Sequence, residues 1–169
     1  MKRSPRHRRH HQQWLLAAAL AGTMLVPAPL RAAAPCEPVG VVDAIISVTP
    51  PADTHVVGLK LQLDYPAGVD LPGDADEASV KARVRPLPGG LMFSPNDTDG
   101  SMIVALVGTT PLAAGPLLEV QFDRCKGQAA PTAKDFHCGI EQGSDDKGGL
   151  LSKGVGCAVA LQAQKGTSK

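Results

Sequence analysis

The sequence predicts an all-β protein, built as one antiparallel sandwich of about eight or nine strands. Apolar and polar residues alternate in several short segments, which is the period of a strand with one buried face. Gly and Pro clusters separate these segments roughly every 8 to 15 residues. No segment sustains the 3.6-residue period of an amphipathic helix. The chain has 169 residues, 43% of them hydrophobic, which suffices for one domain with a substantial core.

The chain begins with a predicted secretory signal peptide, which we place at residues 1–33. Residues 2–9 are mostly basic, residues 14–26 are apolar, and three alanines follow at positions 32–34. This order of segments is typical of an export signal, with cleavage expected after Ala32 or Ala33. Residues 34–169 then form a single domain. The apolar run is shorter than the ~20 residues that a spanning helix requires, so we expect no membrane span.

The strands follow from alternation, read along the chain. Strict alternation predicts strands at residues 57–65, 80–85 and 118–123. Looser strand-like runs occupy residues 41–48, 101–107, 136–142 and 157–162, with a shorter candidate at residues 89–93. Helical signal is limited to a turn or two over residues 75–80, with Asp74 as its cap.

Two segments rich in Asp and Gly, residues 96–100 and 145–149, are predicted to connect strands, because these residue types tolerate left-handed backbone conformations. Asp97 and Asp99 also resemble the middle of a calcium loop, which makes them calcium candidates. A proline and a leucine stand where the rest of that loop needs oxygen ligands. A plain hairpin turn is therefore preferred, and no metal or cofactor is predicted.

The net charge of the exported chain bears on the partners it can bind. Loss of the leader leaves 11 basic residues against 16 acidic ones, a net charge of −5. Because nucleic-acid binding requires a basic surface, we expect no nucleic-acid partner.

All four cysteines remain, and we expect two disulfides in an oxidising compartment. A zinc site is the competing interpretation, but it would favour Cys-x-x-Cys spacing. Spacing alone leaves three disulfide pairings open.

No constellation of catalytic residues is evident, and we expect that the protein is not an enzyme. Nucleophilic and metal-assisted catalysis commonly use histidine, and the exported chain keeps only His55 and His137. Alternation places His137 on the solvent side of its strand, opposite Phe136 and Cys138. An exported glycan hydrolase that uses Asp and Glu residues is retained as a weaker alternative.

A binding surface is predicted on the strand at residues 80–85. Alternation places Lys81, Arg83 and Arg85 in line on its polar side, where three cations on a rigid sheet can dock a partner. A merely solvated strand face is the competing interpretation of the same pattern.

Aromatic residues are too few for a conventional sugar-binding platform. Such modules stack exposed rings on sugars, and the exported chain keeps one Tyr and three Phe. Tyr65 and Phe122 fall on apolar strand faces and are predicted to lie in the core. Phe93 is then the ring that remains as a candidate for stacking on a ligand.

Three segments, taken in chain order, carry a resemblance to a known family. They are residues 58–66, residues 103–107 and residues 115–122, the first ending in Asp64-Tyr65-Pro66. Their order resembles a cohesin domain, a nine-stranded jelly-roll sandwich related to carbohydrate-binding modules. The resemblance covers roughly residues 39–162, nearly all of the predicted domain.

The resemblance implies a jelly roll without catalytic activity that docks a calcium-loaded dockerin on one sheet face. Such docking assembles polysaccharide-degrading enzymes on a scaffold or a cell surface. A jelly roll would place the first and last strands side by side and parallel. It therefore implies a Cys36–Cys157 disulfide, together with a Cys125–Cys138 disulfide between the end of one strand and the start of the next.

We therefore expect a secreted or periplasmic, non-catalytic binding module. Its predicted partner is a dockerin-like protein module in an extracellular polysaccharide-degrading or cell-surface assembly. The alternative is a module that binds a polysaccharide directly. No sequence feature predicts an oligomeric state.

Overall fold

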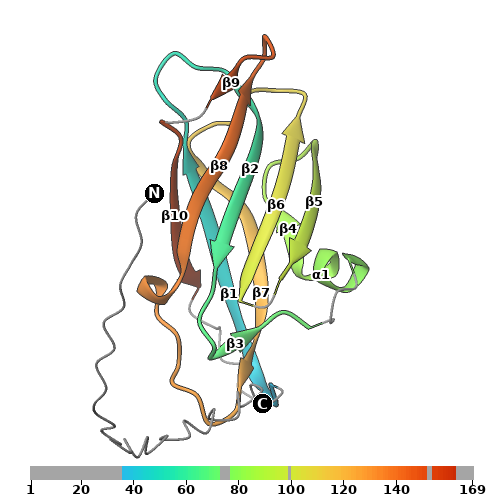
Figure 1. Ribbon diagram of the computed structural model, residues 1–169, viewed down its shortest axis with the longest axis vertical. Helices are drawn as coiled ribbons and strands as arrows, with labels where there is room; N and C mark the ends of the chain where they lie inside the picture. The colour runs from blue at the N-terminus through green and yellow to red at the C-terminus, as the bar shows by residue number, and fades with distance from the viewer. Residues whose placement is uncertain (1–35, 73–76, 99, 152–153, 163–169) are drawn as a thin grey trace, which may run out of the picture. The chain divides into compact units, whose positions relative to one another are not determined.

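The computed structural model describes residues 36–72, 77–98, 100–151 and 154–162. These residues form two antiparallel sheets of five strands each, packed face to face (Figure 1). The predicted all-β antiparallel sandwich is confirmed, with ten strands in place of the expected eight or nine. The predicted signal peptide at residues 1–33 lies outside the described residues.

Sheet A has the strand order β10-β1-β7-β3, and β4 also pairs with β7. The long central strands β1 and β7 pair antiparallel along most of their length. Strand β10 forms one edge of the sheet, and the short strands β3 and β4 share the other. The strands are β1 (Pro38–Thr49), β3 (Val69–Asp70), β4 (Val84–Pro86), β7 (Gly115–Cys125) and β10 (Gly156–Gln162).

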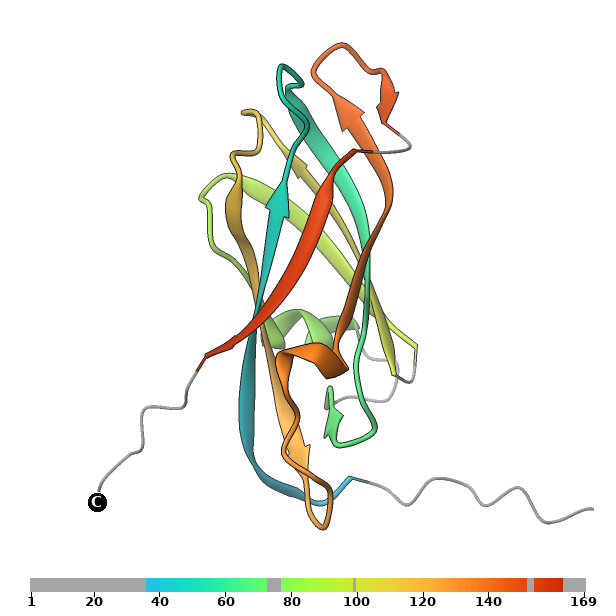
Figure 2. The same cartoon turned by 90° about the vertical axis from the view of Figure 1, so that its left-hand side faces the viewer.

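Sheet B has the order β5-β6-β2-β8-β9 and faces the viewer in Figure 1. Its strands are β2 (Val56–Asp64), β5 (Leu91–Asp97), β6 (Ser101–Gly108), β8 (His137–Asp145) and β9 (Leu150–Leu151). Figure 2 shows the sandwich from its side, with β10 running across the opening between the two sheets. Each predicted strand falls on an observed one, except the segment at residues 80–85.

The core lies between the sheets, where alternation buries one face of each strand. Phe122 is fully buried, and its ring centroid lies 5.0 Å from that of Tyr65 and 5.5 Å from that of Phe136. These separations are typical of favourable tilted aromatic pairs. The prediction that Tyr65 and Phe122 are core residues is confirmed.

Both predicted Asp/Gly connections are hairpin turns. Between β5 and β6, the backbone N–H of Thr98 donates to the Ser101 carbonyl at 2.9 Å. Between β8 and β9, one carboxylate oxygen of Asp145 accepts backbone N–H groups of Lys147 and Gly149, at 3.0 and 2.6 Å. Gly148 has a φ of 79°, a left-handed conformation that glycine adopts without a Cβ clash.

Residues 80–85 do not form the predicted strand. They end helix α1 (Glu77–Arg83) and begin β4. Val80 and Val84 are both buried, at 2% and 4% exposure. A spacing of four residues suits the buried face of a helix as well as that of a strand, so the alternation was ambiguous. Ala82, which a strand would bury, is exposed.

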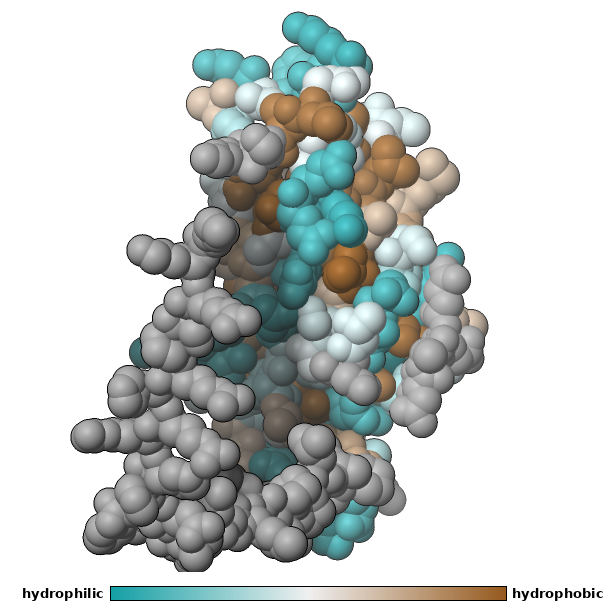
Figure 3. Space-filling view, viewed as in Figure 1, coloured by the Kyte–Doolittle hydropathy of each residue, from teal (hydrophilic) through white to brown (hydrophobic). Residues whose placement is uncertain are grey.

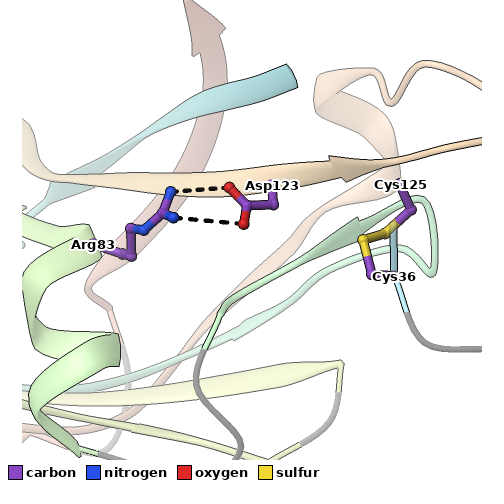
Figure 4. Close-up of a disulfide and its surroundings, with 4 residues drawn as sticks. All are labelled: Cys36, Arg83, Asp123 and Cys125. Atoms are coloured by element: carbon purple, nitrogen blue, oxygen red, sulfur yellow. Dashed lines mark hydrogen bonds and ion pairs between the residues drawn. A yellow bond between two sulfur atoms is a disulfide. The ribbon is translucent and has the colours of Figure 1, made fainter. Parts of the chain in front are cut away.

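The disulfides are Cys36–Cys125 and Cys138–Cys157, so both predicted pairings were wrong. Strand β10 runs antiparallel to β1, with Cys157 opposite Val48 near the end of β1, whereas Cys36 precedes its start. The start of β1 instead pairs with the end of β7, which brings Cys36 to Cys125 (Figure 4). The second disulfide joins β8 of sheet B to β10 of sheet A. Two disulfides indicate that the chain folds in an oxidising compartment.

Candidate binding site

The three predicted docking cations are engaged by neighbouring side chains. Arg83 lies against Asp123, with Nη1 3.0 Å from one carboxylate oxygen (Figure 4). Arg85 forms an ion pair with Glu119, its neighbour across the β4–β7 pair. The two arginines therefore hold α1 and β4 against strand β7 rather than presenting free charge. The prediction of three cations in line on one strand face was wrong.

Lys81 and Phe93 lie together, although they are not part of one exposed platform. The Lys81 ammonium nitrogen lies 5.4 Å from the centroid of the Phe93 ring, a cation–π distance. Phe93 is partly buried on the inner side of β5 and packs against the core. The ring therefore anchors α1 to sheet B and is not presented as a flat stacking surface.

Among the described residues, the calcium candidate Asp97 is not part of a metal-ligand cluster. Asp97 accepts a hydrogen bond from the Tyr65 hydroxyl at 2.7 Å. Burial and this contact raise the pKa of Tyr65 well above its ordinary value. Asp99 lies outside the described residues. In the described part of the chain, no group of three or more His, Cys, Asp or Glu side chains has the arrangement of a metal site.

The two histidines lie far apart in the fold. His137 is exposed at the start of β8, with Phe136 buried behind it, as alternation predicts. His55 precedes β2, and its Nδ1 lies 3.0 Å from a carboxylate oxygen of Asp146. This exposed contact joins the β1–β2 loop to the β8–β9 hairpin. A backbone hydrogen bond from the Asp146 N–H to the His55 carbonyl joins the same two segments.

One row across sheet B holds Ser101, Asp64 and His137, on β6, β2 and β8 respectively. Hydrogen bonds from Gln62 and Ser101, and then the nearby His137, hold the pKa of the Asp64 carboxyl below its usual range. A nucleophilic triad requires histidine between serine and aspartate. Here aspartate occupies the middle strand, so Ser101 and His137 are two strand spacings apart, about 10 Å. The row therefore lacks the order of a triad.

The outer face of sheet B also carries an apolar strip, formed by Met92, Ile103, Ala105 and Val107. Met92 and Val107 are direct cross-strand neighbours on β5 and β6, and are 68% and 44% exposed. In Figure 3 hydrophobic surface reaches the viewer over β6 and β5, beside a hydrophilic area over β2 and β8. Exposed apolar side chains that adjoin one another on a rigid sheet are typical of an interaction surface.

Two shallow hollows flank the Lys60–Glu141 ion pair, whose charged atoms are 2.7 Å apart. The polar hollow has a volume of about 280 Å³ and is lined by Gln62, Asp64, His137, Cys138, Gly139, Ile140 and Glu141. The second hollow, of about 250 Å³, lies over Gly58 and Gly143 and reaches Val107 of the apolar strip. The hollows, the ion pair and the strip together form the candidate binding face.

Sequence reasoning missed this face, although a signal for it exists. Strand β6 alternates poorly because both of its faces are apolar, with Met102 and Val104 inside and Ile103 and Val107 outside. A strand in the middle of a two-layer sandwich normally presents polar residues to solvent. The apolar side chains on the solvent side of the segment 101–107 therefore indicated a binding surface.

Among the described residues, no helix has the length and apolar character needed to cross a bilayer. No protein-family model, no curated protein and no solved structure matches this chain.

Proposed function

We propose that this chain is a secreted, non-catalytic docking module that binds a protein partner on the outer face of sheet B. The observation that carries the proposal is the apolar strip, whose exposed members Met92 and Val107 are cross-strand neighbours on a rigid sheet. Val107 also lines the second hollow. Burial of such a strip stabilises a protein interface, while the polar side chains around it orient the partner.

The partner we propose is a dockerin-like module in an extracellular polysaccharide-degrading or cell-surface assembly. The order of strand segments that resembles a cohesin domain supports this choice, and so does the two-sheet antiparallel sandwich. The antiparallel β1–β10 pair departs from the parallel pair that the resemblance implies. The two disulfides support export, because they require an oxidising compartment. The cations at Lys81, Arg83 and Arg85 are not assigned to the docking face, since they contact Phe93, Asp123 and Glu119.

Calorimetric titration of the oxidised chain with a calcium-loaded dockerin module tests this function. Wild-type protein should bind, and Met92→Asp or Val107→Asp should weaken binding by about tenfold or more, the effect typical of a hot-spot residue. Ala113→Asp, in the exposed loop before β7, is the matched control and should bind as wild type. Absence of binding, or equal binding by all four proteins, would refute the proposal.

Direct binding of a polysaccharide is the second candidate, and the polar hollow favours it. The amide of Gln62, the carboxylate of Asp64 and the imidazole of His137 line this hollow together. Such groups donate and accept the hydrogen bonds that sugar hydroxyls require. Without an exposed aromatic ring among the lining residues, recognition would rest on these polar contacts.

Retention on an insoluble polysaccharide distinguishes the two candidates. Gly139→Val adds a side chain at the polar hollow, where a Cβ has no neighbour within 4 Å. If sugar binding occurs there, this variant should lose retention while Met92→Asp keeps it. Retention that Met92→Asp abolishes and Gly139→Val leaves intact would place any glycan on the apolar strip instead.

A further inference from the structure

Edge strands of a sheet present unpaired backbone groups, which natural proteins usually protect from pairing with another chain. Most edges of this sandwich show such protection. Strands β3 and β9 are two residues long, and β4 and β5 contain Pro86 and Pro95. The part of β8 that does not pair with β9 is also an edge. It carries the charged Glu141 and has an irregular register against β2.

Strand β10 differs from these edges. Its sequence, Gly-Cys-Ala-Val-Ala-Leu-Gln, has seven residues with neither charge nor proline. It pairs with β1 in continuous register, without a bulge, and with no other described strand. Its residues alternate between exposed and partly exposed along the whole strand. Figure 2 shows β10 on the side of the sandwich that faces the viewer.

We propose that β10 is a self-association edge, along which two copies of this chain pair antiparallel about a two-fold axis. An antiparallel strand pair satisfies two-fold symmetry with identical surfaces on both copies. In every register of β10 against itself, no charged side chain opposes another. This neutrality matters because the exported chain carries a net charge of −5, which opposes association through acidic surfaces.

The surroundings of β10 make it a well-ordered template for pairing. Seven consecutive partners on β1 hold one edge, and the Cys138–Cys157 disulfide joins the strand to β8. A strand that is already fixed loses little conformational entropy when a second strand pairs with it. The outward residues Ala158 and Ala160 are small and exposed, so they present no bulky obstacle beside the edge. Pairing there leaves the outer face of sheet B open on both copies.

Analytical ultracentrifugation of the oxidised, exported chain over a wide concentration range tests the proposal. Wild-type protein should show a reversible monomer–dimer equilibrium. Ala158→Lys/Ala160→Lys should raise the dimer dissociation constant about tenfold or more, because two-fold symmetry brings the added charges of both copies together. The control is Ala105→Lys, at an exposed position of β6 in the other sheet. It should leave the dimer dissociation constant unchanged. Circular dichroism checks that each variant is folded.

Hydrogen exchange on the wild-type chain gives a second measurement that requires no substitution. Amides of residues 156–162 should exchange more slowly as the concentration rises into the dimer range. A wild-type chain that stays monomeric would refute self-pairing. This holds even if a strand of another protein is found to protect β10. A dimer that Ala105→Lys weakens and Ala158→Lys/Ala160→Lys does not would place the interface on sheet B and also refute it.

Discussion

Arg83 clamps Asp123 with both terminal nitrogens of its guanidinium, at 3.0 and 3.5 Å from the two carboxylate oxygens. The contact ties the last residue of α1 to the middle of sheet A (Figure 4). Both side chains are largely shielded, at 26% and 14% exposure. Arg83 Nη1 also donates to Gln121, which donates to Asp43 on β1. Arg83 is thus part of the framework of sheet A.

Removal of the Arg83 guanidinium should destabilise the fold. Arg83→Met keeps much of the apolar stem but leaves the shielded Asp123 carboxylate without this ion pair. We expect the free energy of unfolding to fall by about 1–3 kcal/mol, the usual cost of breaking a charge-assisted hydrogen bond. Urea denaturation measures the change. Arg85→Met is the matched control, because the Arg85 side chain is 66% exposed and should contribute less than about 1 kcal/mol. Equal losses in the two variants would contradict the framework role of Arg83.

The Tyr65–Asp97 hydrogen bond should make stability depend on alkaline pH. Burial and this contact raise the pKa of Tyr65 in the folded chain, whereas an unfolded tyrosine ionises near pH ~10. The stabilisation is therefore fully present below pH ~10 and is lost as the pH rises toward the folded-state pKa.

Tyr65→Phe tests that dependence. Near neutral pH the variant should lose about 1–2 kcal/mol of unfolding free energy, because the Asp97 carboxylate no longer receives the hydroxyl hydrogen bond. Above pH ~10 the difference between wild type and variant should shrink, because ionisation of the unfolded wild-type tyrosine removes its advantage. Urea denaturation at a series of pH values follows the difference. A difference that stays constant through this range would show that Tyr65 ionises alike in both states.

The Asp64 carboxyl should titrate below the ordinary aspartate range, chiefly because Gln62 donates to it at 2.7 Å. Its ionised form stabilises the fold above the unfolded pKa of about 3.9, and this contribution is lost as the pH falls through the lowered folded-state pKa. Gln62→Leu should move the Asp64 pKa upward, as measured by carbon NMR of the carboxyl group. Glu141→Gln, which removes a carboxylate elsewhere on the polar hollow, should leave it nearly unchanged. An unmoved pKa in Gln62→Leu would assign the shift to Ser101 and His137.

A non-reducing peptide map should recover Cys36 joined to Cys125, and Cys138 joined to Cys157. Replacement of the second pair by serine should lower the free energy of unfolding by about 3 kcal/mol, the chain-entropy value for a loop with a sequence separation of 19. Urea denaturation of the otherwise oxidised protein measures the loss. A peptide that joins Cys36 to Cys157 would contradict the antiparallel placement of β1 and β10.

Alternation of apolar and polar residues predicted strands well where one face of the strand is buried and the other is exposed to solvent. Residues 57–65 and 118–123 show this pattern and fall on β2 and β7. The same rule failed at residues 80–85, where Val80 and Val84 satisfy both the strand and the helix period. The tertiary structure distinguishes the two, because residues 80–83 end α1 with Ala82 exposed, and Val84 begins β4.

Local residue patterns were sufficient to predict the all-β class, the burial of Tyr65 and Phe122, and the two hairpin turns. These features depend on side-chain period and on residues close together in the chain, such as Asp145 and Gly149. The pairing of the cysteines, the carboxylate partners of the arginines and the apolar strip on sheet B became evident from the three-dimensional arrangement. These relationships join residues as distant as Cys36 and Cys125, so they depend on strand order and direction. A local pattern does not encode that order, because the same alternating strand can pair in either direction and on either side of its neighbours.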